Sequence, residues 1–139
     1  MGDIWGDYAR TVIIEKGKVV SDDGKIGNDE WRMEIAREKR LHARLKEIAS
    51  PEMSFEDLYY QMNDFIKECG YINLDFMGNL GHSIVRRKAD RIYIEKGNNK
   101  KLGDVNYFTF EPHISIAGSK YGYKRENIYY FENQKIEEL

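Results

Sequence analysis

The spacing of apolar positions predicts two amphipathic helices in the first half of the chain. In the first helix, apolar residues recur at roughly helical spacing from Trp31 to Ile48, and Asn28 stands before them as a cap. In the second, Ser54 precedes a stripe of Phe, Leu, Tyr, Met and Ile residues that Gly70 ends. A continuous apolar stripe normally faces a core, so we expect both helices to pack against a sheet.

Short runs rich in β-branched and aromatic residues predict strands on both sides of the helices. Ahead of them, YARTVII and the residues Val19 and Val20 flank a turn at Lys16 and Gly17, which predicts a hairpin. After them come YINLDF, GHSIV, DRIYIE, VNYFTF, ISIAG and NIYYFEN, while KGNNKKLG is typical of an exposed loop. A hairpin, two helices and mostly antiparallel strands make an α+β layout, and we expect residues 1–139 to form one domain.

Composition narrows the range of partners. The chain has 22 Lys and Arg against 24 Asp and Glu, a net charge of -2, and it has no long basic stripe, so we expect no nucleic-acid partner. No apolar run approaches the length of a membrane span, and the start MGDIWGDYAR lacks the features of a signal peptide. We therefore expect no membrane association and a cytoplasmic location.

Four polar side chains stand inside or beside strand-like runs, where a charge is costly without a partner. They are Asp7 in WGDYART, His82 in NLGHSI, Glu111 in FTFEPHI and Glu126 in GYKREN. Taken singly, each has an ordinary structural explanation, such as a turn cap, a hydrogen-bonded core imidazole or an ion pair with a neighbouring cation. Taken together, three carboxylates and an imidazole suit a divalent ion such as Mn, Co, Fe or Zn.

These motifs resemble those of the pita-bread metallopeptidases, the family of methionine aminopeptidase, prolidase and aminopeptidase P. The stretch GDYARTVI is similar to the family's Ser-Asp-x-Thr-Arg-Thr strand, and LGHSI is similar to Gly-His-Gly-Ile-Gly. YFTFEPHI resembles Phe-Thr-x-Glu-Pro-x-Ile, and the last stretch, from GYKREN onward, resembles the closing Arg-x-Glu-Asp strand. The resemblance spans nearly the whole chain in the family's order. It implies a partial pita-bread fold, the C-terminal part of the catalytic domain, in which a curved antiparallel sheet packs on two helices.

The resemblance also implies a site for one or two divalent metal ions. Asp7 and Glu126 correspond to bridging ligands, and His82 and Glu111 correspond to ligands of one ion. Glu111 would in addition move a proton during hydrolysis of a short peptide from its N-terminus, of the Xaa-Pro aminopeptidase or dipeptidase type. His113, two residues after Glu111, is a further candidate for contact with the peptide substrate.

Departures from the family pattern lead to further expectations. The family's first aspartate precedes the Asp-x-Thr-Arg-Thr strand by about a hairpin, whereas Asp3 is the only carboxylate ahead of Asp7, which predicts a mononuclear or weakly loaded site. The family's second histidine, seven residues after the ligand histidine, is replaced by Ala89. An N-terminally short domain would also expose a sheet edge, which favours a homodimer. The alternative function is a catalytically inactive domain that binds a peptide or protein.

Overall fold

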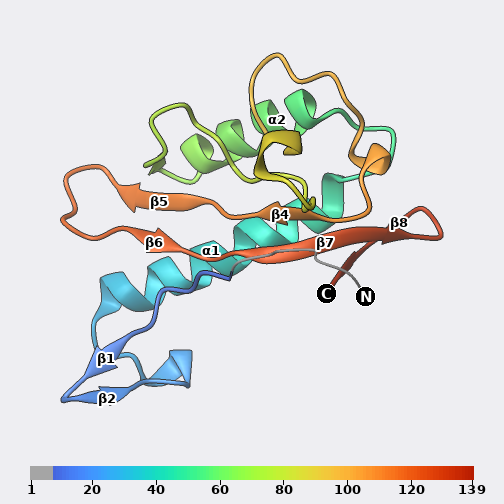
Figure 1. Ribbon diagram of the computed structural model, residues 1–139. Helices are drawn as coiled ribbons and strands as arrows, with labels where there is room; N and C mark the ends of the chain where they lie inside the picture. Colours follow the sequence, from blue (N-terminus) through green and yellow to red (C-terminus); the bar gives the residue numbers. More distant parts are fainter. Residues whose placement is uncertain (1–7) are drawn as a thin grey trace.

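The chain forms short antiparallel sheets packed against two long helices (Figure 1). The computed structural model describes residues 8–139. Its sheets are a hairpin of order β1-β2 and two three-stranded sheets of order β3-β5-β6 and β4-β7-β8. The helices are α1 (Asp29–Ile48) and α2 (Phe55–Glu68). The strands are β1 (Ile14–Glu15), β2 (Lys18–Val19), β3 (Tyr71–Asn73), β4 (Phe108–Phe110), β5 (His113–Ile116), β6 (Tyr123–Lys124), β7 (Asn127–Glu132) and β8 (Lys135–Glu138).

The two three-stranded sheets share one strand register. Phe110 of β4 pairs with Asn127 of β7, and His113 of β5 pairs with Lys124 of β6. Both pairs belong to a single antiparallel alignment, and Figure 1 shows β5 and β6 continuing the paths of β4 and β7. The ladder is interrupted at Pro112, which has no backbone N–H to donate.

Alternation along these strands separates a face covered by helices from the opposite face (the open face), which the helices leave uncovered and beside which the segment around His82 lies. Phe108 contacts Phe55 of α2 with ring centroids 6.2 Å apart, and Phe110 contacts His42 of α1 at 4.9 Å. Both phenylalanines are almost completely buried. The intervening positions of β4 point to the opposite side, so the candidate residues that follow in the same alternation lie away from the helices.

Both helices begin and end at the residues that the sequence predicted. The side chain of Asn28 accepts a hydrogen bond from the Trp31 backbone N–H at the start of α1. Ser54 and Asp57 form a capping box at the start of α2, and Gly70 follows that helix with a φ of 82°. Of the helices that the structure describes, neither is long and apolar enough to span a bilayer.

The buried face of α1 is more polar than its apolar spacing indicated. Leu41 and Leu45 are fully buried as expected, but Glu34, Glu38 and His42 are buried beside them. Tyrosine hydroxyls from β3 and β7 hydrogen-bond to two of these three polar side chains. Helical periodicity of apolar residues predicts that polar residues face solvent. The buried polar side chains between α1 and the sheet were therefore not predicted.

Two predicted strands are not formed. GHSIV and DRIYIE contribute only isolated bridges, which join His82 to Tyr93 and Ser83 to Phe108. Gly81, directly ahead of the first bridge, has a φ of 144° that breaks the extended conformation. The prediction of strands for these two segments was therefore wrong. Their backbones still approach each other and β4 at the bridged residues.

Two tight turns, whose central residues have left-handed backbone conformations with positive φ, form the β1-β2 and β7-β8 hairpins. Lys16 and Gly17, with φ values of 51° and 75°, join β1 to β2 as the sequence predicted. Asn133 and Gln134, with φ values of 49° and 66°, join β7 to β8. Strand β8 was not predicted because its turn contains no glycine, and the Asn at its first position is a weaker signal.

Candidate metal centre

His82 and Glu111 meet on the open face of the sheet. The Nε2 atom of His82 lies 3.6 Å from Oε1 of Glu111. Both side chains line a pocket with a volume of about 640 Å³. Leu74, Phe76 and Tyr93 supply apolar or aromatic parts of its wall. The structure thus brings together two residues that are far apart in the sequence.

His82 is held in one tautomer and one orientation. Its Nδ1 atom lies 2.9 Å from the carbonyl oxygen of Ser83, which can only accept a hydrogen bond, so Nδ1 carries the proton. In the neutral form of the ring, Nε2 then carries the lone pair, and this atom faces Glu111. The Tyr93 ring packs edge-on against the imidazole with centroids 5.8 Å apart. A neutral imidazole that donates its other N–H to a carbonyl is the usual form of a metal ligand, so His82 fits that role.

Close approach of two backbones places His82 beside the strand that carries Glu111. The His82 N–H donates to Oγ1 of Thr109 at 3.1 Å, and the Thr109 N–H donates to the His82 carbonyl at 2.7 Å. A Cβ atom on Gly81 would lie 2.2 Å from the Thr109 carbonyl oxygen. Only glycine fits there, so Gly81 permits the approach that positions His82.

The Glu111 carboxylate lies between an imidazole and an ammonium. Its Oε2 accepts a hydrogen bond from Nζ of Lys124 at 2.7 Å, while Oε1 faces His82. The side chain of Glu111 is 19% exposed and that of Lys124 is 37% exposed, so this ion pair is only partly screened by water. The charge that follows the aromatic strand β4 is therefore compensated from within the chain.

Two further candidate residues share the open face. The register that pairs His113 with Lys124 also places Glu126 opposite Glu111 across the interruption in the ladder. Glu126 is 1% exposed, and its backbone N–H donates to the Ala9 carbonyl at 2.9 Å. His113 lines the pocket, and the pKa of its imidazole is lowered by desolvation of the ring and by the Lys124 ammonium.

The described residues supply part of the expected ligand set. Asp7 lies outside them. Within residues 8–139, no group of three or more His, Cys, Asp and Glu side chains is placed to hold a metal ion. The pair of His82 and Glu111 has donor types and an imidazole orientation that fit a divalent ion. Ala89, which replaces the family's second histidine, is exposed in the turn Lys88–Asp90 and does not line the pocket.

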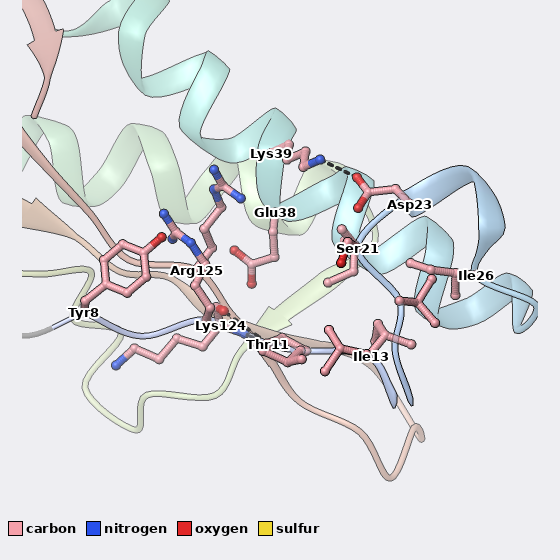
Figure 2. Close-up of a pocket in the computed structure, with 15 residues that line it drawn as sticks. Tyr8, Thr11, Ile13, Ser21, Asp23, Ile26, Glu38, Lys39, Lys124 and Arg125 are labelled. Carbon is pink, nitrogen blue, oxygen red and sulfur yellow. Dashed lines mark hydrogen bonds and ion pairs between the residues drawn. The ribbon is translucent and has the colours of Figure 1, made fainter. Parts of the chain in front are cut away.

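A second pocket, of about 580 Å³, lies on the helix side of the sheet (Figure 2). Glu38 is 2% exposed there, neither of its carboxylate oxygens has a hydrogen-bond partner among the described residues, and burial raises its pKa to about 9. Figure 2 shows its carboxylate between Arg125 and the ion pair of Asp23 with Lys39. The described lining of this pocket contains no imidazole, so it is not a second site of the same kind. Sequence reasoning missed Glu38 because no local motif marks it.

An antiparallel sheet packed on two helices thus carries an imidazole and a carboxylate 3.6 Å apart, and both are donor types that bind divalent ions. The sequence profile described as metallopeptidase family M24 matches residues 2–133, and the chain belongs to this family. No curated protein sequence matches the chain significantly.

Solved structures confirm the fold. The chain is similar to an X-Pro aminopeptidase from Thermotoga maritima MSB8, with a TM-score of 0.73 and 23% identity over 98% of this chain and 35% of that one. It is also similar to a prolidase from Thermococcus sibiricus, with a TM-score of 0.66 and 21% identity over 98% of this chain and 34% of that one. The chain therefore spans about a third of the length of these two proteins. The predicted partial pita-bread fold, with two helices and antiparallel sheets, is confirmed.

Proposed function

We propose that this chain carries metal-binding and proton-transfer residues of a peptidase that removes residues from the N-terminus of short peptides, of the Xaa-Pro aminopeptidase or dipeptidase type. The observation that carries the proposal is the approach of His82 Nε2 to Glu111 Oε1 at 3.6 Å, in a chain of the M24 family. The tautomer fixed by the Ser83 carbonyl leaves that nitrogen ready to bind a cation.

In this proposal His82, Glu111, Glu126 and Asp7 hold one or two divalent ions, drawn from Mn, Co, Fe and Zn. Carboxylate oxygens and a neutral imidazole suit all four metals, so the ligand types alone do not select among them. The register that sets Glu126 opposite Glu111 supports a shared role for these two carboxylates. A bound divalent ion supplies a water molecule of lowered pKa that is nucleophilic at neutral pH.

The protein's own groups then guide the proton and the substrate. In this proposal Glu111, whose two oxygens face His82 and Lys124, takes a proton from the attacking water and returns it to the leaving amine. His113 and Lys124 stand opposite each other on the same face. Both offer hydrogen-bond donors that can orient the peptide and stabilise negative charge on its carbonyl oxygen.

A second candidate function is a domain that binds a peptide or protein without cleaving it. Two observations favour it: Ala89 stands where the family usually has a second histidine, and Lys124 neutralises Glu111 from within the chain. A binding domain needs the pocket and its charges but not proton transfer.

Hydrolysis of the dipeptide Ala-Pro, with and without added Mn²⁺ or Co²⁺, tests the two functions against each other. For the peptidase we expect metal-dependent turnover that Glu111→Gln abolishes. Glu137→Gln, which changes an exposed carboxylate of β8, should leave it unchanged. Tight binding of Ala-Pro with no turnover in any of the three proteins would instead support the binding domain.

A further inference from the structure

The pocket of about 580 Å³ around Glu38 is separate from the candidate metal centre (Figure 2). Its lining comes from residues 8–26, which include the β1-β2 hairpin, from α1, and from β6 with the residue that follows it. Among the described lining residues, Lys124 alone also lines the pocket of His82 and Glu111. A volume of this size is in the range of small-molecule sites in proteins, so the chemistry of the lining decides what the pocket can bind.

Two polar groups of this pocket are buried without partners. Glu38 is 2% exposed, and neither oxygen of its carboxyl group forms a hydrogen bond within residues 8–139. The Nε atom of Arg125 is likewise buried and has no acceptor in the same part of the chain. Burial of such groups without hydrogen bonds costs free energy that an apolar side chain would not cost. A ligand can therefore satisfy both groups without first breaking contacts that they make within the chain.

The charges around Glu38 favour an anionic ligand. Asp23 and Lys39 form an ion pair and cancel each other. Arg10 donates to a backbone carbonyl and to a side-chain amide oxygen, which are neutral acceptors, so these contacts do not balance its charge. Burial raises the pKa of Glu38 to about 9, so at neutral pH its carboxyl group keeps a proton that it can donate. The guanidinium groups of Arg10 and Arg125 then leave this side of the pocket positive.

The other side of the pocket is apolar. Figure 2 shows Ile13 and Ile26 on the side of Glu38 away from the arginine, and both are buried. Val12 and Val19 also line the pocket, and each is more than half exposed. A ligand that covers these valines gains the free energy of removing apolar surface from water. The pocket is therefore suited to a molecule with a charged end and an apolar end.

We propose that this pocket binds a free monocarboxylate with a branched aliphatic body, whose carboxylate contacts Arg125 and the Glu38 carboxyl group and whose body packs against Val19 and Ile13. The guanidinium supplies the opposite charge, and the carboxyl group donates a charge-assisted hydrogen bond to the ligand. An ammonium group in the same place would meet the like charge of the arginines. The proposal needs neither a metal ion nor peptidase activity, so it stands or falls apart from the proposed function.

Amide NMR titrations of the whole chain with a matched ligand series test the chemistry of the pocket. We expect isocaproate to bind with a Kd of about 1 mM or lower and to shift the amide signals of Ile13 and Ile26. Isocaproamide, isohexylamine and acetate lack the negative charge or the aliphatic body, and each should bind about tenfold more weakly. No saturable binding of isocaproate, or tighter binding of the amine or the amide, would overturn the proposal. N-acetylleucine presents the same groups as a peptide C-terminus, and a preference for it would overturn the assignment to a free acid.

Substitutions at both ends of the pocket test where the ligand lies. Glu38→Leu replaces a buried carboxyl group without partners by an apolar group of similar size, so the variant should fold, and we expect it to raise the Kd for isocaproate about tenfold. Glu38→Gln keeps a hydrogen-bond donor and should stay within about threefold of the unchanged protein. Val19→Ser should raise the Kd about threefold, whereas Met33→Ser, which removes an exposed apolar side chain of α1 outside the pocket, should leave it unchanged. Unchanged binding in Glu38→Leu or in Val19→Ser would overturn the proposal.

Discussion

The Nζ atom of Lys124 lies 2.7 Å from Oε2 of Glu111, on the face of the sheet where His82 approaches the other oxygen of the same carboxylate. A fixed ammonium and a divalent cation cannot both take full advantage of one carboxylate, because each repels the other. We therefore expect metal occupancy at this centre to depend on Lys124, which is not one of the proposed ligands.

Replacing Lys124 should strengthen metal binding. We expect Lys124→Met, which keeps the length of the side chain and removes its charge, to lower the Kd for Mn²⁺ by about tenfold, a free energy of about 1.4 kcal/mol. Titration calorimetry on the metal-free protein measures this directly. Lys135→Met, an exposed substitution in β8, serves as the control. Weaker binding in Lys124→Met would show that the lysine supports the site.

Gly81→Ala should unfold the centre locally and destabilise the protein. The added methyl would meet the Thr109 carbonyl at 2.2 Å, and backbone cannot move aside cheaply. We expect a loss of about 3 kcal/mol in the free energy of unfolding, with weaker metal binding through displacement of His82. Urea denaturation measures the first effect.

Gly97→Ala is the matched control for that substitution. Gly97 also has a positive φ, of 84°, but nothing lies within 4 Å of the position of its Cβ. Only the backbone conformation should be penalised there, by about 1 kcal/mol, and metal binding should be unchanged. Equal losses for the two glycines would mean that the contact with Thr109 does not position His82.

The buried Glu38 should make stability depend on pH. Burial raises its pKa from 4.5 to about 9, so the folded protein keeps the proton over a range where the unfolded chain releases it. The free energy of unfolding should therefore fall as the pH rises from about 4.5 to about 9. Glu38→Gln should remove this slope and be the more stable protein at the alkaline end, as measured by urea denaturation across this range.

Glu47→Gln, on the exposed side of the same helix, is the control for Glu38 and should keep the full dependence on pH. A slope that survives in Glu38→Gln would assign the dependence to other groups.

Tyr129→Phe should leave His42, another buried polar residue of α1, without one of its hydrogen-bond partners. Nε2 of His42 lies 2.9 Å from the Arg125 carbonyl and donates to it, so Nδ1 must accept from the Tyr129 hydroxyl at 2.7 Å. Loss of the hydroxyl leaves that nitrogen without its donor, and we expect a cost of about 1–3 kcal/mol. Thermal unfolding compares it with Tyr130→Phe, whose ring is only partly buried and should cost little. Similar losses in both would argue against this hydrogen bond.

The parts of the fold that the sequence predicted are those with local causes. Caps such as Asn28 and Ser54 and the turn at Lys16 act through neighbours a few residues away, so the helices and the first hairpin were predictable. Burial of Glu34 and Glu38 depends on which strands pack against α1, and that is decided by distant parts of the chain.

In the candidate site, too, some residues could be predicted from the sequence and others could not. The motifs around His82 and Glu111 were visible because the resemblance to a family ties them together across the sequence. The approach of Lys124 to Glu111 was not predicted, because it depends on the register between two strands. Phe76 fell within the predicted strand YINLDF, and its exposure was not predicted either, because the strand ends at Asn73 and the chain turns there.

The register shared by the pairs β4–β7 and β5–β6 limits which substitutions the site can accept during evolution. Sliding one of the two long strand paths past the other by a single residue would turn its aromatic side chains to solvent and its charged ones into the core. Burial of Phe108 and Tyr129 on the helix side thus stabilises the register that sets Glu111 opposite Glu126. Substitutions at the charged residues can change the chemistry of the site without changing the strand register. Substitutions in the buried aromatic residues would instead weaken the register itself.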